Sequence, residues 1–179
     1  MPRLVFDVDG VIANFVDGML SLADEMGGYE DQPCCWKHID KWDFFPASMW
    51  QIAKTDAQFW LGLRRMPGVR LKMIVNGIFP DMYLTSRPVG SEVTRHWLAE
   101  NLFPVARVVT VARPEDKLEF LEQGDILVDD LPSTCRSAAE KGVTALLMDA
   151  PFHRGVPQAE IEGLTRITCV SEVAKYIYQ

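Results

Sequence analysis

Regular alternation of strands and helices along the second half of the chain is the feature that most limits the fold. Short apolar runs alternate there with segments of helical spacing. The sequence predicts strands at residues 82–85, 107–111, 126–128, 145–148 and 165–170. It predicts helices at residues 67–77, 92–102, 116–122, 133–141 and 171–178. Such alternation is typical of a parallel sheet covered by helices on both faces, which is an α/β three-layer sandwich.

The first 66 residues follow a different pattern. Residues 4–6 form a short apolar run that ends at Asp7 and is predicted to be a buried strand. Apolar residues then recur at helical spacing from Ile12 to Met26, where Gly27 and Gly28 end a predicted helix. Residues 29–66 are rich in aromatic side chains without β alternation, so we expect short helices and loops. Most of these aromatic side chains are expected to form a small hydrophobic core.

Composition excludes several classes of protein. The chain has 179 residues, 48% of them hydrophobic, and a formal net charge of -7. This length suits one domain or a core with a modest insertion, and the acidic balance opposes binding to nucleic acid polymers. No apolar run approaches the roughly 20 residues that cross a bilayer, and the start of the chain lacks signal-peptide features, so we expect a cytoplasmic protein with no membrane partner. The four cysteines form no C-x-x-C pair, which argues against a zinc knuckle or a disulfide framework.

Three of the predicted strands end at polar residues, namely Asp7, Thr85 and Asp129. In parallel sheets the ligand site lies beyond the carboxyl ends of the strands, so we expect these residues to share one site. Two adjacent acids at the end of an apolar strand, as at Asp129 and Asp130, cost desolvation and repulsion unless a cation is bound.

Each of these motifs is weak on its own. A lone D-x-D is more often a turn, Thr-Ser is more often a capped turn, and a lone lysine is usually solvated. The Asp7 segment does not match a calcium-binding EF-hand loop, and the sequence has neither a nucleotide P-loop nor a dinucleotide-binding G-x-G-x-x-G.

The order of the motifs along the chain resembles the haloacid dehalogenase (HAD) superfamily. Its pattern is an apolar strand followed by D-x-D-G-[TV], a second strand followed by Thr or Ser, a lone Lys, and a strand followed by D-D. The corresponding segments are Asp7-Val8-Asp9-Gly10-Val11, Leu84-Thr85-Ser86, Lys117 and Leu127-Val128-Asp129-Asp130. The resemblance implies a HAD-like Rossmannoid core formed by residues 1–11 and 67–179, with a helical cap inserted at residues 12–66.

The resemblance also implies a mechanism, a Mg²⁺-dependent phosphatase reaction. Asp7 would attack phosphorus to form an aspartyl-phosphate, and Asp9 would act as general acid and then general base. The phosphoryl oxygens would contact Thr85, Ser86 and Lys117.

By the same pattern, the protein ligands of the metal would be the Asp7 side chain, the Asp9 backbone carbonyl and Asp130. Asp129 would hold a metal-bound water or Lys117. Mg²⁺ fits because it favours a few carboxylates, waters and phosphate oxygens.

More narrowly, the sequence is similar to the 5′(3′)-deoxyribonucleotidases, in which aromatic side chains sandwich the base. Phe15 is the best-placed match, followed by Phe59 or Trp60, while Trp42 and Phe44 align less well. Two residues depart from that family: Leu131 stands where the family has Arg, and Arg87 intervenes before Pro88. Arg87 could contact a phosphate or leaving group, or cap the following helix. From this resemblance we expect a small phosphorylated substrate, a nucleoside monophosphate and chiefly a deoxyribonucleotide, hydrolysed to nucleoside and phosphate.

Two alternatives stay open. The first is a HAD phosphatase of another substrate class, such as a sugar phosphate or a polynucleotide 3′ end, although the chain lacks a basic face for a polymer. The second is a phosphate-binding protein without turnover, against which the intact pair Asp7 and Asp9 argues. The sequence is compatible with a homodimer but does not require one.

Overall fold

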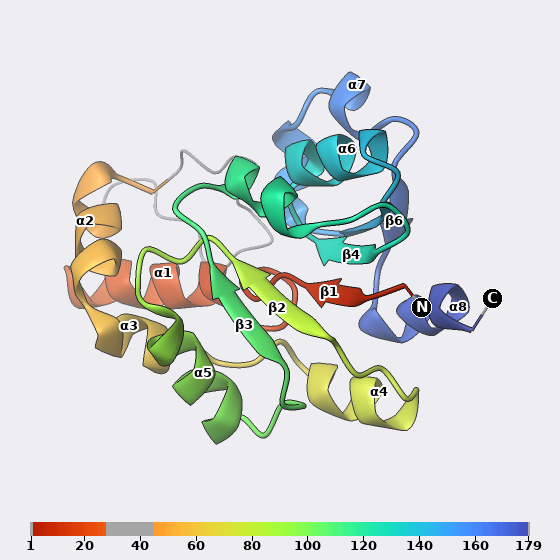
Figure 1. The fold of residues 1–179 in the computed structure, drawn as a ribbon. Coiled ribbons are helices and arrows are strands. Elements are labelled where there is room, and N and C mark those ends of the chain that lie inside the picture. The colour runs from red at the N-terminus through yellow and green to blue at the C-terminus, as the bar shows by residue number, and fades with distance from the viewer. Residues whose placement is uncertain (1, 28–44, 179) are drawn as a thin grey trace.

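One parallel sheet of six strands forms the centre of the molecule (Figure 1). The computed structural model describes residues 2–27 and 45–178. The strands are β1 (Leu4–Phe6), β2 (Met82–Thr85), β3 (Arg107–Thr110), β4 (Ile126–Asp129), β5 (Thr144–Met148) and β6 (Thr165–Ile167), in the spatial order β3-β2-β1-β4-β5-β6. Strand β1 pairs with β2 and β4, and Val5 lies opposite both Met82 and Leu127. The predicted parallel sheet is confirmed.

Helices cover both faces of this sheet. The α-helices are α1 (Phe15–Glu25), α2 (Ala47–Thr55), α3 (Ala57–Leu61), α4 (Val69–Val75), α5 (Ser91–Glu100), α6 (Pro132–Glu140), α7 (Gln158–Ile161) and α8 (Ala174–Ile177). The described residues also form the short 3₁₀ segments η3 (Pro114–Phe120), η4 (Pro151–Gly155) and η5 (Val170–Val173). In Figure 1, α4 and α5 lie below the sheet and α6 and α7 lie above it.

The two faces are separated by strict alternation along the strands, because successive side chains point to opposite sides of a sheet. The side chains that pack toward α4, α5 and α8 include Phe6, Tyr83, Val128 and Leu146. Those that pack toward η3, α6 and α7 include Val5, Leu84, Leu127 and Leu147. The predicted α/β three-layer fold class is thereby confirmed.

Helices α1, α2 and α3 extend from one end of the sheet. Their buried side chains, among them Phe15, Met19, Met49 and Trp60, belong to the same hydrophobic cluster as Phe6 and Tyr83 of the sheet. Two segments, residues 12–14 and 64–66, lie side by side and connect this helical part to the sheet. The Asn14 N–H donates to the Arg64 carbonyl and the Met66 N–H donates to the Ile12 carbonyl, both at 2.8 Å. The division into a core and a 12–66 cap stays a prediction.

The first predicted helix begins three residues later than expected. Residues 8–13 form a tight loop in which the N–H groups of Ile12 and Ala13 both donate to the Val8 carbonyl. The helix then begins at Phe15, because the Asn14 side chain caps it by accepting a hydrogen bond from the Asp17 N–H. The apolar side chain of Ile12, which suggested a longer helix, is buried by this loop instead.

The end of the chain also differs from the prediction. Strand β6 ends at Ile167 because the N–H of Thr168 donates to the Glu172 side chain, which turns the chain away from the sheet. The predicted closing helix is divided between η5 and α8, and the segments η4 and α7 were not predicted. Residues 114–120 form a 3₁₀ helix that begins at a proline, a few residues before the predicted helix at 116–122.

Within residues 2–27 and 45–178, no helix has both the length and the apolar character that crossing a bilayer requires.

Candidate active site at the carboxyl end of the sheet

The polar residues that end the central strands meet at one edge of the sheet. Asp7 follows β1, Thr85 ends β2 and Asp129 ends β4, and these three strands are neighbours. The chain places β2 and β3 on one side of β1 and β4 to β6 on the other, so the strand order switches beside β1. Ligands of parallel α/β proteins bind at such switch points.

Lys117 links two of the aspartates. Its Nζ lies 2.7 Å from Asp7 Oδ2 and 2.7 Å from Asp129 Oδ2, and its side chain is fully buried. Burial lowers the pKa of Lys117, but the Asp129 and Asp7 carboxylates more than offset this effect and raise the pKa above its ordinary value. Lys117 is therefore a fixed positive charge within the site.

Three carboxylates crowd this site. Oxygens of Asp7, Asp129 and Asp130 all lie within 4.8 Å of one another, and Asp130 Oδ2 is buried with no hydrogen-bond partner among the described residues. Burial, reinforced by the neighbouring carboxylates, raises the pKa of Asp130 well above its ordinary value. Burial also raises the pKa of Asp7, to about 7, although Lys117 opposes this shift.

The charge of the cluster suits a divalent cation. When all three aspartates are ionised, they and Lys117 together carry a net charge of -2, and Asp130 Oδ2 has no hydrogen-bond partner among the described residues. Carboxylate oxygens are the protein ligands that Mg²⁺ prefers. Asp130 offers the unpartnered oxygen, and Asp7 lines the same cavity, so these two residues fit a metal site best. The Asp7 oxygens also accept from Lys117 Nζ and from the Val8 N–H, both at 2.7 Å. Asp129 lies behind them and accepts from Lys117 Nζ at 2.7 Å and from the Leu131 N–H at 2.8 Å.

Gly10 permits the close approach of two loops. Its φ angle of 75° lies in the left-handed region, and a Cβ at this position would overlap the Asp130 carboxylate. The glycine of the D-x-D-G segment thus allows the β1–α1 loop to pack directly against the β4–α6 loop.

The Asp9 side chain lies apart from the three clustered carboxylates. Arg87 donates to it twice, from Nε to Oδ2 and from Nη2 to Oδ1, each at 2.8 Å. The Thr85 hydroxyl also lies 3.5 Å from Asp9 Oδ2. Among the described residues, the Asp9 side chain is therefore not one of the clustered carboxylates that could hold a metal.

A small cavity of ≈ 100 Å³ opens beside Asp7. Its lining includes Asp7, Asp9, Phe15, Trp50, Trp60, Ser86, Arg87, Pro88, Asp130 and Leu131. Seven of the residues selected from the sequence are therefore brought together around one space. Thr85, Lys117 and Asp129 are buried beneath its wall and do not line it. Thr85 contacts Asp9, and Lys117 contacts both Asp7 and Asp129.

Aromatic side chains from the helical part close this cavity. Phe15 stacks on Trp60 with ring centroids 5.6 Å apart, and Trp50 lies 5.5 Å from Phe15. Trp50 was not selected from the sequence, where nothing in its spacing distinguishes it from the other aromatic residues of 29–66.

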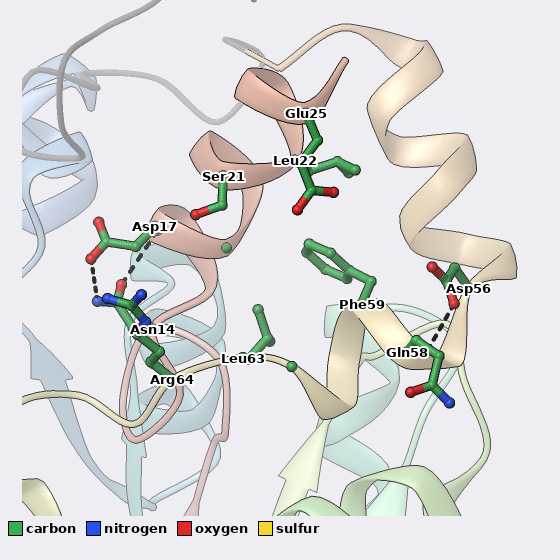
Figure 2. Close-up of a pocket in the computed structure, with 12 residues that line it drawn as sticks. Asn14, Asp17, Ser21, Leu22, Glu25, Asp56, Gln58, Phe59, Leu63 and Arg64 are labelled. Atoms are coloured by element: carbon green, nitrogen blue, oxygen red, sulfur yellow. Dashed lines mark hydrogen bonds between the residues drawn. The ribbon is translucent and has the colours of Figure 1, made fainter. Parts of the chain in front are cut away.

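Phe59 does not line this cavity. It contacts Phe15 and Trp60 edge-on but faces a separate hollow of ≈ 300 Å³ between α1 and α3, where Leu22 and Glu25 lie nearby (Figure 2). Its predicted role in substrate binding stays a prediction. Trp42 and Phe44 lie outside the described residues.

His153 was also missed by the sequence analysis. Its Nε2 lies 2.7 Å from the backbone oxygen of Asp130, and its Nδ1 accepts from the Ala150 N–H at 3.3 Å, so Nε2 carries the proton and donates to Asp130. Burial lowers the pKa of His153, which favours this neutral form. A single histidine 23 residues from its partner gives no signal in the sequence.

Comparisons with known proteins agree with this architecture. No protein-family model and no curated protein matches the sequence. Among solved structures, similar folds include the HAD-hydrolase YfnB from Bacillus subtilis bound to magnesium, with a TM-score of 0.63, 12% identity, and coverage of 100% of both chains. A HAD-superfamily hydrolase of subfamily IA from Geobacter sulfurreducens has a TM-score of 0.62 and 17% identity, with 98% of this chain and 99% of that chain covered.

An L-2-haloacid dehalogenase has a TM-score of 0.61 and 13% identity, with 99% of each chain covered. At these identities the likeness concerns the fold. The order of the strands, the helices on both faces and the polar residues at the carboxyl edge lead to one conclusion: this chain has the α/β fold of the HAD-superfamily hydrolases.

Proposed function

We propose that this protein is a Mg²⁺-dependent phosphomonoester hydrolase in which Asp7 is the nucleophile. The observation that carries the proposal is the position of Asp7, which lines the cavity while Lys117 holds its Oδ2 at 2.7 Å and Asp130 lies beside it. A carboxylate held in this way can attack a phosphorus atom placed in the cavity.

The charges around Asp7 address the main obstacle to that attack. An anionic nucleophile and a phosphate oxygen repel each other by about 4 kcal/mol per pair of unit charges at roughly 4 Å and an effective dielectric of 20. Lys117 offsets part of this repulsion. Mg²⁺, held by Asp7 and Asp130, would supply the remaining positive charge.

For proton transfer we propose Asp9. It lines the same cavity as Asp7, from the position two residues further along the loop. The cycle begins with a proton on Asp9, which then gives up one of its two hydrogen bonds from Arg87. In the first step the Asp7 oxygen bonds to phosphorus, the bond to the leaving oxygen breaks, and that oxygen takes the proton of Asp9. In the second step water attacks phosphorus, gives a proton to Asp9 and releases Asp7 and phosphate.

The presence of Asp9 also favours a phosphatase over a dehalogenase. A halide leaves carbon as a stable anion and needs no proton, whereas an alkoxide leaving from phosphorus does. A carboxyl group that faces the cavity beside the nucleophile can supply this proton to the alkoxide, whereas in a dehalogenase it could act only later, as a base for the attacking water.

For the substrate, we propose a nucleoside monophosphate, chiefly a deoxyribonucleotide. Phe15, Trp50 and Trp60 provide aromatic surface on the cavity wall, and stacking contributes about 1–3 kcal/mol per base. The cavity of ≈ 100 Å³ is smaller than the roughly 300–1,000 Å³ typical of small-molecule sites. A nucleoside would therefore have to separate the stacked rings of Phe15 and Trp60.

The experiment is a panel of substrates assayed with Mg²⁺ and with EDTA. It contains deoxyribonucleotides, ribonucleotides, sugar phosphates, a 3′-phosphorylated oligonucleotide and a 2-haloacid. We expect phosphate release from nucleotides in Mg²⁺ only. Preference for sugar phosphates over every nucleotide would reject the substrate class, and halide release without phosphate release would reject the phosphatase.

Asp7→Asn provides the matched test of the nucleophile. The substitution preserves size while removing the attacking charge, so turnover should fall by at least about 10³-fold, within the range that loss of a covalent catalyst produces. Circular dichroism should show an unchanged fold. Substantial residual turnover would exclude Asp7 from its proposed role.

A further inference from the structure

Arg87 occupies a position that stability alone does not explain. Its side chain is fully buried, and its guanidinium carbon lies 5.1 Å from the centre of the Trp60 ring and 5.2 Å from that of Trp97. Two of its nitrogens are paired with Asp9, but the third, Nη1, is buried without a hydrogen-bond partner among the described residues. Buried ion pairs are often no more stabilising than apolar side chains of similar volume, and an unpartnered buried donor is destabilising.

The geometry of this arrangement is well defined. The planar fork of an arginine side chain matches the two oxygens of a carboxylate, so the pair fixes both the position and the plane of the Asp9 carboxyl group. The two tryptophan rings in turn fix the plane of the guanidinium group, since a cation is attracted to the face of an aromatic ring. Asp9 is thereby oriented at the cavity through a second side chain.

The two rings come from different parts of the molecule. Trp97 lies on α5, beside the sheet, and its Nε1 donates to the Leu63 carbonyl at 2.7 Å. Trp60 lies on α3, and its Nε1 donates to the Ala53 carbonyl at 2.6 Å. Trp60 also stacks on Phe15, at the start of α1. Arg87 itself follows β2, so one guanidinium group joins the helical part to the loop that carries Asp9.

We propose that Arg87 is a positioning residue that sets the orientation of Asp9 for proton transfer to the leaving oxygen, and that Trp60 supports it from the helical part. This inference rests on the proposed phosphatase function. Arg87 is a departure from the sequence pattern of the deoxyribonucleotidases. In this proposal it acts through Asp9 and not by direct contact with the phosphoryl group.

The experiment compares two leaving groups. p-Nitrophenolate leaves readily without a proton, whereas the alkoxide of an alkyl phosphate requires one. Lysine at position 87 keeps the charge but lacks the planar fork. In Arg87→Lys we expect kcat/KM for the alkyl phosphate to fall roughly 10- to 100-fold more than kcat/KM for p-nitrophenyl phosphate. This loss is a part of the roughly 10²- to 10⁴-fold that general acid catalysis contributes.

A double-mutant cycle with Asp9→Asn separates positioning from a general loss of structure. If Arg87 acts through Asp9, adding Arg87→Lys to Asp9→Asn leaves the ratio between the two substrates within about twofold. An equal loss for both substrates, or no loss, in folded Arg87→Lys overturns the inference.

A second variant is available should Arg87→Lys not fold. Trp60→Phe retains Arg87 but weakens the ring that supports it, and we expect a smaller change of the ratio in the same direction. An unchanged ratio in folded Trp60→Phe then overturns the inference. If the wild-type protein hydrolyses neither phosphate, the proposed function itself fails. If it hydrolyses both and the variants do not discriminate between them, only the role of Arg87 fails.

Discussion

Asp7 is buried in a site that disfavours its charge. Burial raises its pKa to about 7, repulsion from Asp129 adds to the shift, and Lys117 opposes it. An unfolded aspartate has a pKa of about 4, so between pH 4 and 7 the folded state binds more protons than the unfolded state. In the absence of metal, the contribution of Asp7 to the free energy of unfolding therefore decreases as the pH rises through this window.

Asp7→Asn should remove this pH dependence. Urea unfolding in EDTA would measure the free energy of unfolding of the wild type and of Asp7→Asn at pH 5 and at pH 8. We expect the difference between the two proteins to change from one pH to the other by on the order of a few kcal/mol. The titration of His153 contributes to the pH dependence of stability in both proteins, so its contribution cancels when they are compared. A stability difference that is the same at both pH values would contradict the raised pKa.

Gly10 illustrates how one residue controls the distance between two loops. Gly10→Ala should be destabilising for two reasons, because an alanine at positive φ costs roughly 1–2 kcal/mol and because its Cβ would overlap the Asp130 carboxylate. Gly124→Ala is the control, since Gly124 also has a positive φ, of 89°, but no atom lies within 4 Å of an added Cβ. Thermal unfolding should show a larger loss for Gly10→Ala, and only this variant should lose activity. Equal losses would mean that the contact with Asp130 is unimportant.

At the scale of elements, the first strand is held to β4 by more than its backbone hydrogen bonds. Arg3, just before β1, donates from Nη2 to Asp125 Oδ2 at 2.6 Å and from Nε to Oδ1 at 3.1 Å. Asp125 precedes β4 and also accepts from the Glu122 N–H at 2.8 Å. Because Asp125 is buried, this ion pair anchors the two central strands at the edge opposite the site.

Asp125→Asn should cost about 1–3 kcal/mol of stability, the range for buried hydrogen bonds to charged groups. Burial alone would raise the pKa of Asp125, but Arg3 and the Glu122 N–H outweigh burial and lower it. The contribution is therefore present above the unfolded pKa of about 4 and is lost as the pH falls below it. Chemical denaturation at pH 7 and pH 3 would test both statements.

Glu92→Gln is the control for this measurement. It breaks an exposed ion pair with Arg95, on the surface of α5, which should contribute at most about 1 kcal/mol. A loss in Asp125→Asn no larger than in Glu92→Gln would show that the buried pair does not anchor the strands.

At the scale of the whole molecule, a bound metal would join segments that are far apart in the sequence. Asp7 follows the first strand and Asp130 the fourth, so an ion held by both stabilises the folded chain and not the unfolded one. At 100 times its dissociation constant, Mg²⁺ should add about 2.7 kcal/mol, which raises the Tm of a chain of this size by roughly 5–10 °C.

Two variants test where this stabilisation arises. Asp130→Asn should abolish the Mg²⁺-dependent rise in Tm. The metal-free protein should become no less stable, because burial and the neighbouring carboxylates disfavour a charge at position 130. Asp9→Asn should keep the rise, because its side chain is paired with Arg87 instead of facing the three carboxylates. Differential scanning calorimetry with Mg²⁺ and with EDTA would measure the rise in Tm for each variant. Loss of the rise in both variants would contradict a metal site that includes Asp130 but not the Asp9 side chain.

Local pattern was sufficient to predict the layered architecture and the polar edge of the sheet. Strand periodicity and the residue at which each strand ends are properties of short segments, and parallel pairing then brings Asp7, Thr85 and Asp129 to one edge. The start of α1 after Asn14 and the end of β6 before Thr168 were not predicted, because a side-chain hydrogen bond sets each boundary and apolar spacing does not reveal it.

The sequence by itself thus determined the sheet, the central acids and the lysine that faces them. Only the tertiary structure decided that Arg87 pairs with Asp9, that Phe15 stacks on Trp60 and that His153 supports Asp130. The physical reason is that these contacts join residues 23 to 78 positions apart, so they depend on how helices pack against the sheet. No local preference of the chain encodes that packing, whereas the alternation of a strand is written in its own residues.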